Sequence, residues 1–294
     1  MTNTRIRKVA VLVLSGLWVA ASHAADTGNS RLSEERVKQE NIYRSNAQQV
    51  AAGYTVDRSL EVYTQGLSSD FGPALANLGP THRWLDIGAG EGLAILDYVT
   101  AGDDLPPVAG KDRRGRKAQA VAMSIEDRRT PRWQATAARL GPNQIRYLAD
   151  RRLREYSLEE LGKFQVITDV IGGFSYTENL SLFMEKVMGL LEVNGSFFTV
   201  LQDVHREDGT NRPFYPGARF LTEISNTQDS ELKVCAWLKR ITCAEVSCQS
   251  RPQWKPPIEA FRVRKVCDEV TVPTLTTVHY EAGTPPERRF RLKD

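Results

Sequence analysis

The chain has 294 residues and is predicted to fold as an α/β protein with a doubly wound, mostly parallel sheet. Two observations predict this class. Between residues 83 and 201, short apolar runs of strand length alternate with segments of helical periodicity. The first apolar run ends in a glycine-rich turn from which a helix begins. Strands separated by helices pair in parallel through right-handed crossovers, which gives a sheet covered by helices.

Residues 1–24 have the three-part form of a secretory signal peptide. A basic start is followed by an apolar run from Val9 to Ala21 and by small residues at Ser22 and Ala24. Cleavage is expected after Ala24, which places the mature protein in the periplasm or outside the cell. An uncleaved anchor is the alternative, but this run is shorter than the roughly 20 residues that a spanning helix needs. We therefore expect no membrane span after the signal is removed.

In the N-terminal segment 25–78, residues 25–33 are polar and are expected to be disordered, whereas residues 34–78 are predicted to be helical, because apolar residues recur there at helical spacing. The pattern is interrupted at Gly53 and ends near Phe71-Gly72-Pro73. The core, 79–205, then alternates strands and helices. The expected strands are Arg83–Ile87, Ala118–Ile125, Gln144–Leu148, Phe164–Val170 and Ser196–Leu201, and the expected helices are Leu93–Thr100, Trp133–Leu140 and Leu180–Leu191. Residues 100–117 are rich in Gly, Pro and charge and are expected to form an inserted loop.

The last segment, 206–294, is expected to extend the same domain with two late strands, Phe261–Val266 and Thr271–Tyr280, that form an antiparallel pair. All four cysteines lie beside them. An even number of cysteines in an exported chain favours disulfides over a metal site. Of the three possible pairings, we prefer Cys243 with Cys248, which closes a short loop, and Cys235 with Cys267.

The overall charge does not favour a general attraction to nucleic acid or to anionic membranes. Residues 1–24 hold three basic side chains, so 36 of the 39 basic side chains remain against 36 acidic ones. Between Lys111 and Arg154, however, basic residues outnumber acidic ones by nine. This stretch is either a solvated basic face or the side that attracts an anionic substrate. Docking on nucleic acid is a weaker alternative, because few aromatic residues are interleaved.

The turn Gly88-Ala89-Gly90-Glu91-Gly92 follows the first strand and its terminal Asp86. In an open parallel sheet, this carboxyl edge is where ligands bind. A dinucleotide fits the turn poorly, since the fingerprint G-x-G-x-x-G needs a glycine where Leu93 stands. Asp86 and Glu91 also place two carboxylates where a pyrophosphate would lie, at a Coulomb cost on the order of several kcal/mol. The turn is therefore better suited to a cation.

The stretch Leu85-Asp86-Ile87-Gly88-Ala89-Gly90-Glu91-Gly92 resembles the first motif of class I S-adenosylmethionine-dependent methyltransferases. The resemblance covers residues 54–201 and implies a Rossmann-like core that binds S-adenosylmethionine. It implies that Asp86 holds the methionine amino group, directly or through water. It also implies that the backbone at Gly88 and Gly90 lines the methionine and ribose, with Ala89 and Gly92 in the same cofactor-binding turn.

The resemblance further implies an acid after the second strand that binds the ribose hydroxyls. The register leaves two candidates, Ser124 and Glu126, and we slightly favour Glu126. Asp150, after the third strand, would accept from the adenine amino group, or else cap a helix or pair with a nearby arginine. Asp169 lies at the end of the fourth strand, and the loop that follows would pass close to the cofactor and its transferring methyl group, with Asp169 on the cofactor side.

Methyl transfer by in-line displacement depends mainly on orientation, which supplies up to roughly 7 to 11 kcal/mol in favourable systems. If the acceptor also needs a base, Asp169, Tyr176 and His205 are candidates, with a capping acid, a core aromatic and a surface histidine as the alternatives. No G-x-S-x-G turn or metal-ligand spacing occurs. The sequence predicts a methyltransferase for a small or lipid-like acceptor, with an exported, non-catalytic binding or scaffold protein as the alternative.

Overall fold

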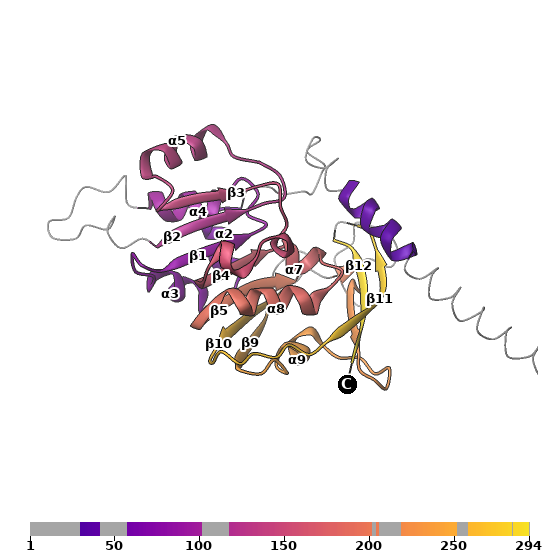
Figure 1. Cartoon of the computed structure of the whole chain (residues 1–294). Helices are drawn as coiled ribbons and strands as arrows, with labels where there is room; N and C mark the ends of the chain where they lie inside the picture. Colours follow the sequence, from indigo (N-terminus) through magenta and orange to yellow (C-terminus); the bar gives the residue numbers. More distant parts are fainter. Residues whose placement is uncertain are drawn as a thin grey trace, which may run out of the picture.

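The computed structural model describes residues 30–41, 58–101, 118–201, 204–205, 219–251, 258–283 and 285–293, and the side chains of 204–205 and 219–220 are outside this description. The predicted signal peptide therefore lies outside the described residues. A seven-stranded sheet runs through the molecule in the order β3-β2-β1-β4-β5-β10-β9 (Figure 1). Its strands are β1 (Arg83–Ile87), β2 (Gln119–Met123), β3 (Ile145–Leu148), β4 (Phe164–Val170), β5 (Leu191–Leu201), β9 (Ala244–Arg251) and β10 (Ile258–Lys265).

The first five strands of this sheet are parallel, and β10 pairs antiparallel with both β5 and β9. The predicted doubly wound, mostly parallel α/β fold is thus confirmed, and its 3-2-1-4-5 order is that of a Rossmann-like sheet. The helices are α2 (Leu60–Gly66), α3 (Phe71–Ala76), α4 (Leu93–Thr100), α5 (Pro131–Leu140), α6 (Leu158–Leu161), α7 (Gly173–Tyr176), α8 (Leu180–Leu190) and α9 (Val234–Leu238), together with the 3-10 turn η2 (Leu153–Glu155).

Two hydrophobic clusters show that the sheet is buried on both faces. On β1, Trp84 belongs to one cluster, which also holds residues of α2, α3, α4 and α5. Leu85 and Ile87 belong to the other, which also holds residues of α6, α7, α8 and α9. Neighbouring strand residues point to opposite faces, so this alternation places helices on both sides of the sheet.

Local sequence signals explain where the helices begin. The Ser59 hydroxyl accepts from the backbone N–H of Val62 at the start of α2, and the Thr130 hydroxyl accepts from that of Trp133 at the start of α5. The sequence predicted a helix end near Phe71-Gly72-Pro73, whereas α3 begins at Phe71. Proline is tolerated there because the first turn of a helix has no intrahelical acceptor for its missing N–H.

The predicted pairing of the two late strands is wrong. β10 lies inside the large sheet, whereas β11 (Leu275–Glu281) belongs to a small sheet with β12 (Glu287–Leu292) and β8 (Thr222–Ser225). The reason lies in their patterns. Ala260 and Phe261 on β10 are both fully buried, so β10 needs cover on both faces, while β11 buries residues mainly on one. A further short pair joins β6 (Val204–His205) and β7 (Arg219–Phe220).

The preferred disulfide pairing is also wrong. Cys235 bonds to Cys248, and Cys243 bonds to Cys267. Cys243 directly precedes β9 and Cys248 lies within it, so the extended strand separates them by roughly 16 Å, which is too far for a disulfide. In the antiparallel register, Ala244 pairs with Lys265, which brings Cys243 and Cys267 to the same end of the β9–β10 pair.

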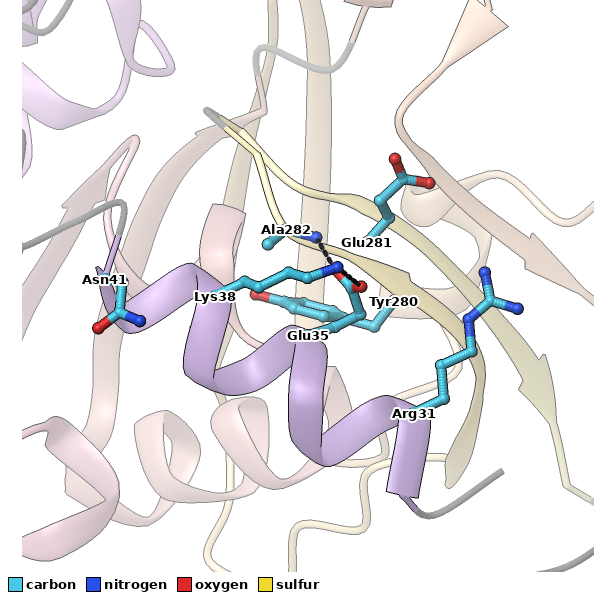
Figure 2. Close-up of a pocket in the computed structure, with 7 residues that line it drawn as sticks. All are labelled: Arg31, Glu35, Lys38, Asn41, Tyr280, Glu281 and Ala282. Carbon is cyan, nitrogen blue, oxygen red and sulfur yellow. Dashed lines mark hydrogen bonds and ion pairs between the residues drawn. The ribbon is translucent and has the colours of Figure 1, made fainter. Parts of the chain in front are cut away.

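A helix over residues 30–41 packs against the end of β11 (Figure 1). The backbone N–H of Ala282 donates to Glu35 (3.0 Å), and that of Gly283 donates to Gln39 (2.9 Å). A groove of about 520 Å³ lies between this helix and β11. On the helix itself, the Lys38 ammonium pairs with Glu35, one turn earlier in the same helix (Figure 2). Because the charges along this groove are already paired in part, it does not define a ligand class.

Candidate functional site

The switch point of the sheet lies between β1 and β4, because the chain runs from β1 outward to β2 and β3 before returning to β4. Ligands of open α/β sheets bind at the carboxyl edge next to such a point. The predicted glycine turn follows β1 at this edge, and the loop 171–173 follows β4 beside it. The sequence-predicted turn therefore lies where the topology favours a ligand.

The two loops meet backbone to backbone. A Cβ on Gly88 would lie 2.8 Å from the Cα of Gly172, and Gly88 has a φ of +72°. The N–H groups of Gly88 and Ala89 both donate to the carbonyl of Met123 at the end of β2, at 2.9 and 3.0 Å. Ile171 has a φ of +57°, which is strained for a β-branched residue. Such strain is found preferentially at functional sites.

Aromatic side chains support the other half of the turn. A Cβ on Gly92 would lie 2.4 Å from the ring of Trp133, so only glycine fits there. Trp133 packs edge-on against Tyr147, with ring centroids 5.2 Å apart. The Tyr147 hydroxyl donates to the carbonyl of Gly90 at 2.5 Å. Gly88 and Gly90 themselves stay partly exposed, so the turn presents its backbone at the surface.

Asp86 is fully buried at the end of β1. The Tyr63 hydroxyl of α2 donates to its carboxylate, at 3.0 Å from each oxygen, and the Thr168 hydroxyl of β4 donates to Oδ1 at 2.7 Å. The indole N–H of Trp84 donates in turn to the Thr168 hydroxyl at 2.8 Å. The predicted cofactor-binding acid therefore belongs to a buried network that joins α2, β1 and β4.

Asp169 is also fully buried, at the corresponding place on β4. Its Oδ1 accepts the backbone N–H of Gly172 at 2.9 Å, and its Oδ2 accepts that of Phe174 at 3.0 Å. These two bonds fix the loop that contacts Gly88. Asp169 thus extends from β4 so that its carboxylate binds the start of α7 and shapes this loop. This arrangement is the capping alternative of the sequence analysis.

The two carboxyls create an electrostatic feature beneath the turn. Burial raises the pKa of Asp86 from 3.8 to about 7 and that of Asp169 likewise to about 7, against the opposing effect of the hydrogen bonds that each accepts. Among the described residues, no Lys or Arg side chain is hydrogen-bonded to either acid, although Arg58 acts on both at longer range. A cationic ligand near this edge would stabilise the ionised forms.

The two candidates for the ribose differ in their accessibility. Ser124 is buried, at 4% exposure, and its N–H donates to the carbonyl of Leu148. Glu126 is partly exposed and forms an ion pair with Arg128 at 3.1 Å. The Tyr147 hydroxyl that binds Gly90 also lies 3.4 Å from the backbone carbonyl of Glu126, so Glu126 is brought to the glycine turn. The ribose role of either residue stays a prediction.

The remaining candidates lie around this edge at different depths. Asp150 is exposed after β3 and has a φ of +68°, so the adenine role stays a prediction. Tyr176 ends α7 and is partly buried, and its carbonyl accepts from the Tyr280 hydroxyl at 3.0 Å. The backbone of His205 pairs with Arg219 in β6 and β7, but its side chain lies outside the described residues. Their roles as bases also stay predictions.

Sequence reasoning missed three residues that shape the site, Tyr63, Thr168 and Tyr147. Tyr63 lies in the predicted N-terminal helical segment 25–78, where its hydroxyl gives no indication of its partner. Thr168 pairs in register with Asp86 across β1 and β4, so knowing the strand order would have placed them together. Tyr147 lies next to the end of β3 and depends on the same order.

Among the residues that the structure describes, no cluster of three or more His, Cys, Asp or Glu side chains is arranged to hold a metal ion. In the same part of the chain, every helix is too short or too polar to cross a membrane.

No protein-family model and no curated protein matches the chain. Among solved structures, it is similar to an rRNA methylase from Streptococcus thermophilus, with 12% identity, a TM-score of 0.40 and coverage of 73% of this chain and 100% of that one. It is similar to a precorrin-6y C5,15-methyltransferase from Geobacter metallireducens, with 13% identity, a TM-score of 0.40 and coverage of 73% of this chain and 93% of that one. It is also similar to PKMT2 from Rickettsia typhi in complex with AdoHcy, with 20% identity, a TM-score of 0.32 and coverage of 44% of this chain and 22% of that one.

Proposed function

We propose that the protein binds S-adenosylmethionine at the glycine turn and transfers its methyl group to a small or lipid-like acceptor. The observation that carries this proposal is the pair of buried carboxyls, Asp86 and Asp169, beneath a glycine turn at the switch point of the sheet. Their charge disfavours a phosphate and favours a cation, and the cofactor bears an ammonium and a sulfonium. The resemblance of residues 85–92 to the first methyltransferase motif supports the same conclusion.

In this proposal, the protein's own groups bind and orient. Asp86 attracts the ammonium end of the cofactor, and the partly exposed backbone of Gly88 and Gly90 lies along it. Glu126 accepts from the ribose hydroxyls, and Asp150 accepts from the adenine amino group. When bound, the cofactor supplies an electrophilic methyl group with a good leaving group. Orientation of the acceptor in line with that methyl is then the main contribution of the loop after β4.

Asp169 does not serve as the base in this proposal, because both its oxygens accept backbone N–H groups of the loop. Tyr176 and His205 remain as candidates for an acceptor that must lose a proton. The same observation favours the second candidate function, an exported binding or scaffold protein that has the fold but no turnover. The two disulfides suit the oxidising compartment that both functions share.

The proposal is tested by isothermal titration of the purified protein with S-adenosylmethionine, S-adenosylhomocysteine and NAD. We expect the two sulfur nucleosides to bind and NAD not to bind. Glu126→Gln should weaken binding by roughly 10- to 100-fold, since it removes a charge-assisted hydrogen bond. Asp127→Asn is the matched control, because Asp127 pairs with Arg129 at the surface and should leave the affinity unchanged.

Ser124→Ala decides between the two ribose candidates, because loss of affinity in this variant but not in Glu126→Gln would assign the role to Ser124. Binding of NAD alone would replace the proposal with a dinucleotide site. An absence of heat with all three ligands would leave the scaffold function ahead. Binding without methyl transfer to any acceptor in a panel of small amines, phenols, carboxylates and lipids would favour that second function as well.

A further inference from the structure

The hydrogen bonds around Asp86 have a fixed direction, which the residue types impose. An indole N–H can only donate, so Thr168 must accept from Trp84. The single hydroxyl proton of Thr168 is then directed to Asp86, 2.7 Å away, rather than to the Leu85 carbonyl at 3.4 Å. Thr168 is therefore a donor to Asp86 and not an acceptor from it.

Tyr63 supplies the second donor. Its ring is held in the core, at 2% exposure, next to Phe71 with centroids 6.3 Å apart. Burial raises the pKa of Tyr63 well above its usual value, so the hydroxyl keeps its proton. That proton lies between the two oxygens of Asp86, each at 3.0 Å. Asp86 thus receives two hydroxyl donors, an arrangement that matches a carboxylate better than a carboxylic acid.

Within the described part of the chain, the Asp86 carboxylate has an acceptor position left for a further donor. An ionised carboxylate has about four acceptor positions. Among the described residues, Oδ1 of Asp86 accepts the Thr168 hydroxyl and also lies 3.0 Å from the Tyr63 hydroxyl, whereas Oδ2 has the Tyr63 hydroxyl alone. Oδ2 therefore retains capacity for the N–H of a ligand, or for a water molecule that bridges to it.

Other charged groups act on Asp86 from the elements packed around it. Asp169, from β4, opposes its ionisation, and burial does so more strongly. Arg58, from the segment that precedes α2, favours the ionised form at longer range. The two hydroxyl bonds oppose burial and lower the pKa, which remains at about 7. The charge of Asp86 is thus balanced near neutral pH, and loss of one donor would shift it towards the neutral form.

We propose that Tyr63 is a positioning residue that, together with Thr168, holds Asp86 in place and keeps its carboxylate charged for a cationic ligand. The identity of that ligand rests on the proposed function, but the state of the carboxylate does not. Tyr63 contacts Asp86 and not the ligand, so it acts through the charge and orientation of the acid. A role of Tyr63 in core packing alone would affect stability without changing how Asp86 titrates.

The first experiment uses the ligand-free protein. The titration of Asp86 is followed by NMR of carbon-13-labelled aspartate carboxyls, with Asp86→Asn to assign the signal. Tyr63→Phe keeps the ring but removes the donor, and it should raise the titration midpoint by about one pH unit. Thr168→Ser keeps a hydroxyl and should leave the midpoint unchanged. Tyr98→Phe is the control in the same core, because the Tyr98 hydroxyl accepts the backbone N–H of Ala118 and is not hydrogen-bonded to Asp86.

The second experiment measures the affinity of the same variants for S-adenosylmethionine between pH 6 and pH 9. With its midpoint raised by one pH unit, Tyr63→Phe should bind about fivefold more weakly than wild type at pH 7 and equally well at pH 9, where Asp86 is ionised in both. Coincident Asp86 titrations in Tyr63→Phe and wild type would overturn the role of Tyr63. Wild-type protein that binds no S-adenosylmethionine at any pH would instead overturn the proposed function, which is a separate result.

Discussion

Asp86 and Asp169 have the same burial and a similar pKa but different hydrogen-bond donors. Asp86 receives hydroxyls, which can rotate, whereas Asp169 receives backbone N–H groups, which cannot. An amide at position 86 can keep its partners, because its carbonyl can face Thr168 while its NH2 group donates to the Tyr63 oxygen. An amide at position 169 must turn its NH2 group towards one backbone N–H, which loses a hydrogen bond.

We therefore expect the free energy of unfolding of Asp169→Asn to be about 1 to 3 kcal/mol lower than that of Asp86→Asn at pH 5. Urea unfolding of both variants and wild type at pH 5 measures the difference. At this pH, both wild-type acids are largely protonated in the folded state and equally ionised when unfolded, so the difference between the two variants isolates hydrogen-bond geometry from charge. Equal losses in the two variants would contradict the distinction between rotatable and fixed donors.

The raised pKa values also predict how stability depends on pH. Each acid titrates near 3.8 when unfolded and at about 7 when folded, so its contribution is fully present below pH 3.8 and is lost as the pH rises through 7. Ionisation of one such buried acid costs up to about 4 kcal/mol by pH 8. Asp86→Asn should therefore flatten the decline between pH 5 and pH 8. A surface variant, Asp127→Asn, should follow the wild-type slope in the same urea series.

The sequence predicted the bounds of helices and strands most accurately where a single hydrophobic pattern dominates. The bounds of β1, α4 and β4 were predicted to the residue, because each is a compact apolar run that ends at glycine or at a change of period. Long-range pairing was not predictable in this way. The antiparallel partners of β10, and hence the neighbours of the cysteines, depend on which strands are buried on both faces, and a single sequence does not show that. The position of Thr168 opposite Asp86 also depends on which strands pair, so it was not predictable from the sequence either.

The β9–β10 pair gives the disulfides a testable structural role. Cys243–Cys267 ties the two strands at one end, and Cys235–Cys248 ties α9 to β9 at the edge of the sheet. The bonded cysteines are 13 and 24 residues apart, so chain entropy predicts that each bond stabilises by about 3 kcal/mol.

Double replacement of Cys243 and Cys267 by serine should lower the free energy of unfolding by about that amount, as measured in urea without reductant. Hydrogen exchange should accelerate first in β9 and β10, whereas the amides of β1 and β4 keep their protection relative to global unfolding. Uniform acceleration across all strands would mean that the bond acts on the whole fold rather than on this edge.

Polar contacts attach the helix over residues 30–41 to the rest of the molecule. Arg36 donates to Glu178, and Glu40 pairs with Arg152 at 2.8 Å. Glu35 accepts the backbone N–H of Ala282, directly after β11. Val37 of this helix is 55% exposed, so little apolar surface is buried there. The helix nevertheless connects the loops that follow β3 and α7 with the end of the small sheet, three regions that lie far apart in the sequence.

Partly exposed ion pairs contribute about 0 to 1 kcal/mol each and weaken in salt, so this helix should open locally without global unfolding. Raising sodium chloride from 0.1 M to 1 M should accelerate hydrogen exchange of residues 30–41 while the amides of β4 and β5 keep their rates. Arg36→Ala should produce part of the same acceleration at low salt. Arg31→Ala is the control, because Arg31 forms no ion pair with any other described residue. Since hydrophobic attachment strengthens in salt, slower exchange at 1 M would show that apolar contacts hold this helix instead.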